Sequence, residues 1–259
     1  MFDYKKFDIK TSGNYQDRHP FPYAYFDGLF NAEILKKVNK EIDEPNFELD
    51  RRDDDGIQIK VRSDYADNES LSPNIKEVFQ VINGGKFMKQ LSRLTGIEGL
   101  ISDPYFDGGG VNIIENKGTL AVHIDGTTQE RMQVCRRVNV ILFLNESWDA
   151  DWNGMHEQWD FTRKDLSPTD PAQDWVCVRK ILPKFNRLYV FTTNDNSWHG
   201  HAGSLKLPNG IERRSLIAYY YTSTRPESDL SFDSPHRAIF INYANTVTES
   251  AYEKTEFIF

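Results

Sequence analysis

Short strand-like segments separated by turn residues follow one another from Gly96 almost to the end of the chain. This succession is typical of an antiparallel β sandwich or barrel. Glycine-rich stretches at 107–110 and 116–118 mark turns between segments. We therefore predict strands over residues 110–114, 119–124, 137–144, 155–161, 187–193 and 215–221.

The residues before Gly96 show helical periodicity instead. After an arm over residues 1–19 and a strand over 21–26, Asn31 is a good cap for a helix, and Pro73 opens a second helical region that residues 83–85 interrupt. Each predicted helix has a single apolar face, so the helices should pack on the outside of a sheet. The charged residues 44–68 predict a solvated loop and an edge hairpin. At the other end, residues 238–243 predict a strand, and a short helix should begin at Glu249.

The charge balance excludes some classes of partner. A net charge of −8 makes nucleic acid and anionic membrane poor partners. No apolar run is long enough for a signal peptide or a membrane span, and Cys135 and Cys177 are expected to be free thiols. We expect a soluble, cytoplasmic protein.

One predicted strand, over residues 119–124, delivers two polar side chains to one side. Because side chains alternate along a strand, His123 and Asp125 point the same way and Leu120, Val122 and Ile124 point the other way. A histidine and a carboxylate at this spacing are half of a metal site.

Two stretches farther along the chain could add to this half-site. The stretch Ser197-Trp-His-Gly-His201 offers His199 or His201 as a third ligand, giving the two-histidine, one-carboxylate face that leaves open positions on non-haem iron. Farther along, Arg213 and Ser215 stand at i and i+2, so a guanidinium fork and a hydroxyl can point into one pocket and bind a carboxylate.

The order of these motifs resembles that of the prolyl 4-hydroxylase-like iron(II)- and 2-oxoglutarate-dependent dioxygenases, which fold as a double-stranded β-helix. The resemblance covers most of the chain. It is carried by Pro20-Phe-Pro-Tyr23, Leu94-Thr-Gly-Ile97, Leu100-Ile-Ser-Asp-Pro104, Gly108-Gly-Gly-Val-Asn112, His123-Ile-Asp125, Arg137-Val-Asn-Val-Ile-Leu-Phe-Leu-Asn145, Trp152-Asn-Gly-Met155, Gln158-Trp-Asp160, Pro183-Lys-Phe-Asn-Arg187, His199-Gly-His201 and Arg213-Arg-Ser215.

The resemblance implies a role for each of the motif residues. His123, Asp125 and His199 would be the catalytic iron ligands, with His201 as the alternative to His199. Arg213 and Ser215 would bind 2-oxoglutarate. The cosubstrates would be 2-oxoglutarate and O2, with ascorbate as a further candidate reductant. One oxygen atom would enter the substrate and one would enter succinate.

The chain also departs from the family pattern. Phe143 stands where relatives usually carry a tyrosine whose hydroxyl bonds the cosubstrate carboxylate, a hydrogen bond worth roughly 1 kcal/mol. Asn153-Gly154 replaces the usual Gly-Gly. The stretch 163–179 is longer than usual and predicts either a lid or a surface insertion. His156 and His236 are interpreted as ordinary polar residues.

These observations predict a single α+β, mainly β domain over residues 1–259. It would comprise a helical buttress (1–95), a jelly-roll or cupin-like double-stranded β-helix core (96–222) and a C-terminal extension (223–259). The predicted activity is hydroxylation of an unactivated C–H bond, with peptidyl proline as the leading substrate. The alternatives are a hydroxylase of a free amino acid or small metabolite, and a non-catalytic metal- or ligand-binding module. The partner would be a peptide, protein or small-molecule substrate, and the oligomeric state is not predicted.

Overall fold

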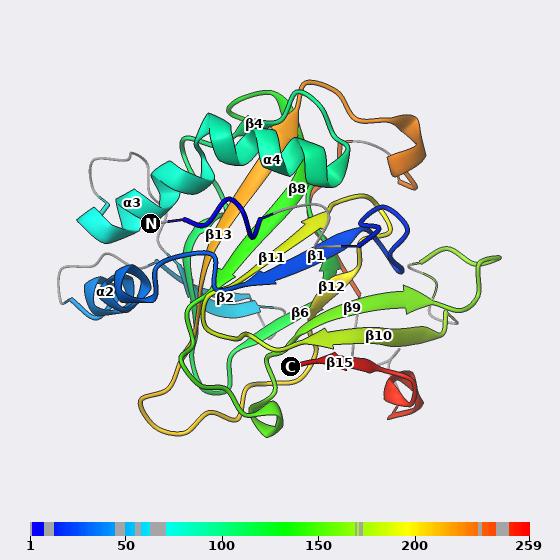
Figure 1. Cartoon of the computed structure of the whole chain (residues 1–259). Helices are drawn as coiled ribbons and strands as arrows, with labels where there is room; N and C mark the ends of the chain where they lie inside the picture. Colours follow the sequence, from blue (N-terminus) through cyan, green and yellow to red (C-terminus); the bar gives the residue numbers. More distant parts are fainter. Residues whose placement is uncertain are drawn as a thin grey trace.

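The computed structural model describes residues 2–7, 13–44, 50–54, 58–62, 71–168, 170, 173–232, 235–241 and 249–259. Strands from both halves of the chain pair in one continuous hydrogen-bonded path, and the helices lie along its outside (Figure 1). None of the helices in these residues is long and apolar enough to cross a membrane.

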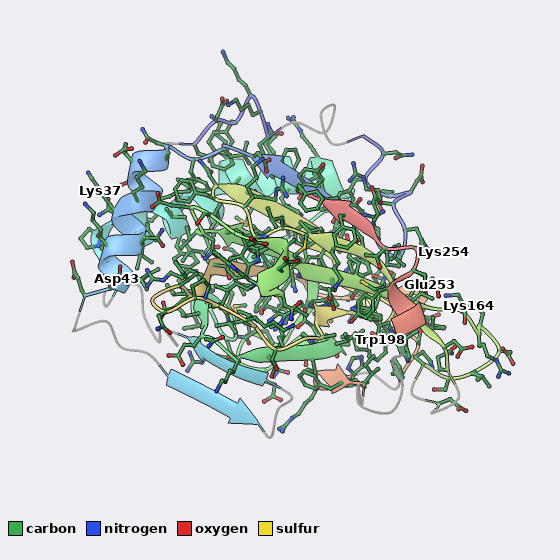
Figure 2. All side chains as sticks on the ribbon, turned by 90° about the horizontal axis from the view of Figure 1, so that it is seen from below. Lys37, Asp43, Lys164, Trp198, Glu253 and Lys254 are labelled. Atoms are coloured by element: carbon green, nitrogen blue, oxygen red, sulfur yellow. The ribbon has the colours of Figure 1, made fainter. Side chains whose placement is uncertain are left out.

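Within the described residues, three α-helices form the outer layer: α2 (Ala32–Ile42), α3 (Pro73–Ile82) and α4 (Gly85–Thr95). The predicted cap is confirmed, because Asn31 Oδ1 accepts a hydrogen bond from Glu33 N at 2.8 Å. At the start of α3, the buried Glu41 carboxylate accepts hydrogen bonds from Asn74 N and Ile75 N, which satisfies backbone donors that a helix leaves free. Figure 2 shows Lys37 and Asp43 on the outer side of the molecule, where α2 faces solvent.

The sheet path runs in an order that differs from the order along the chain. In sequence along that path, its strands are β1 (Tyr23–Asp27), β11 (Arg187–Thr192), β8 (Val134–Phe143), β13 (Arg213–Thr222), β5 (Gly110–Ile114), β3 (Gln58–Arg62), β6 (Thr119–Ile124), β12 (His199–His201), β9 (His156–Phe161), β10 (Trp175–Ile181) and β15 (Glu256–Ile258). The remaining short elements are β2 (Asp50–Asp54), β4 (Ile101–Ser102), β7 (Thr128–Gln129), β14 (Ile239–Phe240), η1 (Ala150–Trp152), η2 (Glu227–Asp229) and η3 (Glu249–Tyr252).

Alternation along β8 divides the interior into two parts. Val138, Val140 and Leu142 pack with the helices in the main hydrophobic core, where Phe7 and Tyr15 of the N-terminal arm are also buried. Ile141 and Phe143 face the other way, into an aromatic cluster with Tyr189 and Phe191.

The two ends of the sheet path face each other across this aromatic cluster. Gln158 Nε2 of β9 donates to the Tyr189 hydroxyl of β11 at 2.7 Å, and the His156 ring lies 4.7 Å from that of Tyr189. Any polar group on the inner faces therefore lies between two layers of strands. This is the double-stranded β-helix arrangement that the sequence predicts.

Most predicted strands are found close to their expected bounds, and those over 110–114 and 119–124 are confirmed without change. The interpretation of residues 163–179 as one loop is wrong at its end, because β10 begins at Trp175 and pairs with β9. Trp175 and Cys177 alternate as buried side chains, a strand pattern that the prolines before it obscured. The described loop therefore ends before Trp175.

The predictions near the remaining termini and loops have mixed outcomes. The edge hairpin is present as β2 and β3, whereas most of the charged loop 44–68 lies outside the described residues. The strand expected over 238–243 is found only as β14, because residues 238 and 241 are not part of a strand and 242–243 lie outside the described residues. The short helix expected from Glu249 is the 3-10 turn η3.

Candidate metal centre

The end of β6 carries two polar groups beside each other, the buried His123 and the partly buried Asp125 that follows the strand. His123 is 7% exposed, and its Nε2 lies 3.7 Å from Asp125 Oδ1. On the opposite side of the strand, Val122 and Ile124 join a separate apolar cluster, which also contains Trp198 (Figure 2). The alternation that the sequence predicts thus separates a polar side from an apolar side.

The third group comes from β12, which pairs antiparallel with β6 so that His199 lies opposite His123. His199 Nε2 lies 3.7 Å from Asp125 Oδ2, and the two imidazole centroids are 4.5 Å apart. Gly200 permits this approach: a Cβ at that position would lie 2.8 Å from the carbonyl oxygens of Leu120 and Ala121. A strand with a larger residue there could not pack as closely against β6.

Backbone contacts orient both imidazoles. The Nδ1 atom of His123 lies 2.8 Å from the Ala121 carbonyl oxygen, and Nδ1 of His199 lies 2.8 Å from that of Ser197. A carbonyl oxygen can only accept, so Nδ1 carries a proton, and in the neutral form of each ring Nε2 is the atom with the free lone pair. Both lone pairs belong to the nitrogen atoms that lie near Asp125.

The donor set fits a divalent transition metal. One ligand atom from each of His123, Asp125 and His199 lies within 4.8 Å of the others. Two neutral imidazoles and one carboxylate suit ferrous iron and leave coordination positions for other ligands. Three side chains separated in sequence thus converge on one point.

Two side chains of β8 hold the Asp125 carboxylate, and the sequence analysis missed both. Arg136 Nη1 lies 3.2 Å from Asp125 Oδ1, and Asn139 Nδ2 donates to Oδ2 at 2.6 Å. Burial alone would raise the pKa of Asp125, but Arg136 and the two histidines outweigh it and hold this pKa below its ordinary value. The carboxylate is therefore ionised at neutral pH.

Arg213 lies in the same cavity, buried and 5% exposed. Its Nε donates to the Gly154 carbonyl oxygen at 2.6 Å, and its guanidinium lies 5.2 Å from the Phe143 ring centroid. Among the residues that the structure describes, no carboxylate pairs with it, and burial lowers the pKa of Arg213 to about 10. An unpaired buried guanidinium is costly, so this group points to an anionic ligand.

Ser215 faces the same cavity from β13, directly opposite Phe143 of β8. It is fully buried, and its Oγ has no hydrogen-bond partner within the described part of the chain. Arg213 and Ser215 thus reach one cavity, as the sequence predicts, and both have unused donors for a carboxylate.

The other histidines have different positions. His201 lines the cavity with Arg213, but His199 rather than His201 lies with His123 and Asp125. His156 also lines this cavity, and its ring stacks on His199 with centroids 5.4 Å apart. The interpretation of His156 as an ordinary polar residue is therefore wrong. Its inward position on β9 was the available signal, but the sequence did not show which face of β9 points inward.

A second, open cavity of about 850 Å³ adjoins the enclosed cavity that contains Arg213. His123, Asp125 and Tyr219 line both cavities. His123 and Gln129, which line the bottom of this open cavity, are buried. Its rim includes exposed residues, namely Asp107, Glu130, Gln133, Pro235, Arg237 and Ala238. All three converging groups thus line the enclosed cavity, and His123 and Asp125 also line the surface opening.

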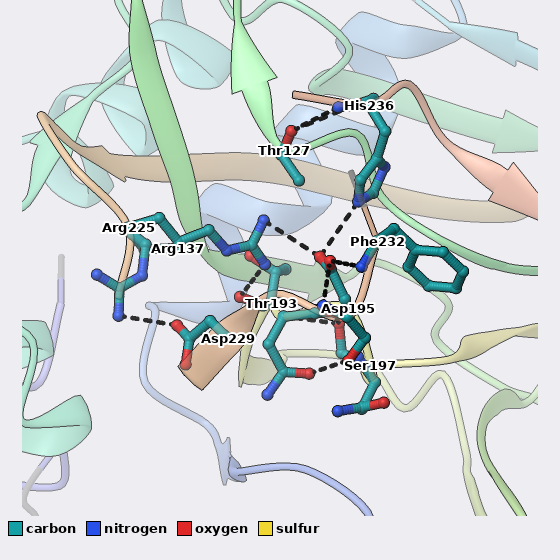
Figure 3. A network of polar contacts seen from close by, with 12 residues as sticks. Thr127, Arg137, Thr193, Asp195, Ser197, Arg225, Asp229, Phe232 and His236 are labelled. Atoms are coloured by element: carbon teal, nitrogen blue, oxygen red, sulfur yellow. Dashed lines mark hydrogen bonds and ion pairs between the residues drawn. The ribbon is translucent and has the colours of Figure 1, made fainter. Parts of the chain in front are cut away.

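Residues 235–238 form one wall of the open cavity, and contacts with Asp195 hold this part of the chain against the core (Figure 3). The Asp195 carboxylate accepts hydrogen bonds from Ser231 N and Phe232 N, and His236 Nε2 lies 3.2 Å from it. Arg137 Nη2 lies 3.2 Å from Asp229 in the same network. His236 is therefore an anchor of the cavity wall and not a surface residue.

Comparisons with known proteins agree with this geometry. Residues 109–221 match the model of the 2OG-Fe(II) oxygenase superfamily. Among curated proteins, none matches this chain in sequence. The fold is similar to a prolyl-4-hydroxylase from Pseudomonas putida, with a TM-score of 0.52, 14% identity, and 81% of this chain and 97% of that chain covered.

Two further solved structures share the fold. A prolyl hydroxylase from Trichoplax adhaerens, in complex with a peptide fragment of a hypoxia inducible factor, has a TM-score of 0.53 and 14% identity, covering 82% of this chain and 90% of that chain. The epimerase SnoN, in complex with Fe3+, α-ketoglutarate and nogalamycin RO, has a TM-score of 0.51 and 13% identity, covering 94% and 96%. The comparisons confirm the predicted double-stranded β-helix fold.

Proposed function

We propose that this chain, an iron(II)- and 2-oxoglutarate-dependent oxygenase by its family match and fold, hydroxylates an unactivated C–H bond, with peptidyl proline as the leading substrate. One observation carries the proposal. His123, Asp125 and His199 converge on an enclosed cavity that contains Arg213, and His123 and Asp125 also line an open cavity that reaches the surface.

In this proposal, His123, Asp125 and His199 hold the iron, and Arg213 with Ser215 holds the distal carboxylate of 2-oxoglutarate. When bound, iron and 2-oxoglutarate supply the oxidising chemistry that divides O2 between succinate and the hydroxylated substrate. The protein supplies the positions. The backbone carbonyls of Ala121 and Ser197 fix both imidazole rings, and Asn139 fixes the carboxylate.

The two cavities separate the two organic reactants. The enclosed cavity excludes water around Arg213, which strengthens the attraction between its guanidinium and a carboxylate. The open cavity presents the other side of His123 and Asp125 to the substrate, with Tyr219 at the junction. Substrate and cosubstrate can then occupy opposite sides of the same three ligands.

Two observations support a peptide as the substrate. The rim of the 850 Å³ cavity is exposed at Asp107, Glu130 and Arg237, and an extended chain needs such an opening. A protein of similar fold is known with a peptide fragment bound.

Succinate release tests the substrate class. The purified chain with iron(II), 2-oxoglutarate and oxygen should release more succinate when proline-containing peptides are added than when free proline or other amino acids are added. The stimulating peptide should gain one oxygen atom by mass spectrometry. Stimulation only by a free amino acid or metabolite would replace the peptide assignment. Metal binding without any succinate, across all substrates, would favour a non-catalytic module.

A further inference from the structure

Phe143 leaves the proposed cosubstrate pocket without the hydroxyl that the resembling family uses there. The ring of Phe143 is fully buried and faces the Arg213 guanidinium at 5.2 Å. Ser215 lies opposite it on β13. This side of the pocket therefore presents a guanidinium, a serine hydroxyl and an apolar ring, and a donor that takes the place of the tyrosine hydroxyl would come from another strand.

His156 of β9 is such a donor. It is 4% exposed and lines the cavity together with Arg213 and Ser215. Its Nε2 is buried and finds no hydrogen-bond partner in the ranges that the structure describes. A buried polar atom without a hydrogen-bond partner costs about 1–3 kcal/mol. The unpartnered Nε2 of His156 therefore points to a ligand that forms this hydrogen bond.

Neighbouring rings fix the position of His156. Its centroid lies 4.7 Å from Tyr189, 5.4 Å from Phe191 and 5.4 Å from His199. The antiparallel pairing of β12 with β9 places Gly200 opposite Glu157, which brings His201 to the same side as His156. The imidazole is thus held in place before any ligand arrives.

A buried imidazole can act as a hydrogen-bond donor without carrying a charge. A neutral imidazole carries one N–H donor and no charge. It can bond a carboxylate without adding a second cation beside Arg213, which is also how a tyrosine hydroxyl acts.

We propose that His156 donates a hydrogen bond to the distal carboxylate of 2-oxoglutarate and so replaces the tyrosine hydroxyl that is missing at Phe143. The inference rests on the proposed function, because it assumes that Arg213 binds that carboxylate. It makes His156 a cosubstrate-positioning residue, contributed by β9, in addition to Arg213 and Ser215 of β13.

Binding to the manganese-loaded full-length chain tests this role without turnover. Calorimetry would compare 2-oxoglutarate with 2-oxobutyrate, which lacks the distal carboxylate, in the wild type, His156→Leu, Phe143→Tyr and the double variant. We expect His156→Leu to weaken 2-oxoglutarate binding about tenfold and to change 2-oxobutyrate binding less than about twofold. Phe143→Tyr should have little effect alone and should restore most of the lost affinity in the His156→Leu background.

The possible results distinguish the role of His156 from the proposed function on which it rests. Equal 2-oxoglutarate affinity in His156→Leu and wild type would overturn the role of His156, as would equal losses for both ligands. A wild type that binds neither ligand would instead overturn the proposed function. Thermal unfolding and manganese content of each variant show whether the fold and the metal site are intact, and His156→Asn, which keeps an N–H donor, serves as a second probe if His156→Leu is misfolded.

Discussion

The Arg136 guanidinium lies 3.2 Å from the Asp125 carboxylate. Regular alternation along β8 would instead place Arg137 on the side of Asn139 that faces Asp125. The pairing of β8 with β13 skips Arg137, because Val138 lies opposite Tyr220 and Arg136 lies opposite Tyr221. This bulge turns Arg136 to the side of Asn139. One bulge therefore gives the proposed iron ligand its ion-pair partner and leaves Arg137 to bind Asp229.

Asn139 should set the metal affinity through Asp125. Replacing it by leucine removes the 2.6 Å hydrogen bond to Oδ2 and frees the carboxylate to rotate. Groups that orient a metal ligand typically contribute a factor of 10 to 100 in affinity, so we expect metal binding to weaken by about that amount. Competition with a chelator of known affinity measures it, and unchanged affinity in Asn139→Leu would contradict the prediction.

His199 and His201 should behave differently when each is replaced by alanine. His199 Nε2 lies 3.7 Å from Asp125, whereas His201 is not part of the group that could hold a metal among the described residues. We expect His199→Ala to lose stoichiometric iron(II) and His201→Ala to keep it. Metal content after anaerobic loading and desalting gives the answer, and the reverse result would make His201 the ligand.

Arg213 should lower the thermal stability of the metal-free protein and raise its affinity for 2-oxoglutarate. Its buried guanidinium has no ion-pair partner within the described ranges, so Arg213→Met removes a desolvated charge. We expect the metal-free variant to unfold at the same temperature as the wild type or at a higher one. Its affinity for 2-oxoglutarate should fall roughly a hundredfold or more. Calorimetry and thermal unfolding measure the two effects, and marked destabilisation with unchanged ligand affinity would assign Arg213 a structural role.

The Asp27–Arg187 pair should make stability depend on acidic pH. Arg187 donates to Asp27 Oδ1 at 2.7 Å and to Oδ2 at 2.9 Å. Burial opposes ionisation, but these bonds, with Lys184, lower the pKa of Asp27. Because the folded pKa lies below the unfolded value of about 3.9, the stabilisation is complete above that pH and is lost as the pH falls through the folded pKa.

For this pair, Asp27→Asn should be about 1–2 kcal/mol less stable than wild type at neutral pH, a modest figure because the Asp27 side chain is 36% exposed. The difference in the free energy of unfolding between wild type and Asp27→Asn should become smaller below about pH 4. Urea unfolding across this pH range measures it. Asp165→Asn, at an exposed surface pair, is the control that should leave the midpoint unchanged. A gap that stays constant with pH would show that the pair's ionisation does not matter.

Strand alternation was sufficient to place His123 and Asp125 together, since His123 lies on the regular strand β6 and Asp125 directly follows its last residue. The strand β10 was missed because its buried residues, Trp175 and Cys177, follow a loop whose prolines dominate the pattern. His156 was missed because a histidine on a strand is polar on either face, and only the packing of β9 against Tyr189 shows which way it points.

Arg136 could not have been found by alternation, because a bulge shifts the period at one residue without a clear sequence signal. The same limit applies to the Asp195 network, which joins residues on separate segments through backbone donors of Ser231 and Phe232. Local periodicity predicts which side chains share a face, and tertiary packing decides which faces meet.

The central claim is that His123, Asp125 and His199 hold an iron(II) that 2-oxoglutarate can chelate. Its most direct test is the visible absorption spectrum of the chain under anaerobic conditions, first with iron(II) and then with 2-oxoglutarate. We predict a weak charge-transfer band that appears only when both are present, is absent in His123→Ala, and decays with succinate release when oxygen is admitted. No band in the wild type, together with equal iron content in wild type and His123→Ala, would contradict it.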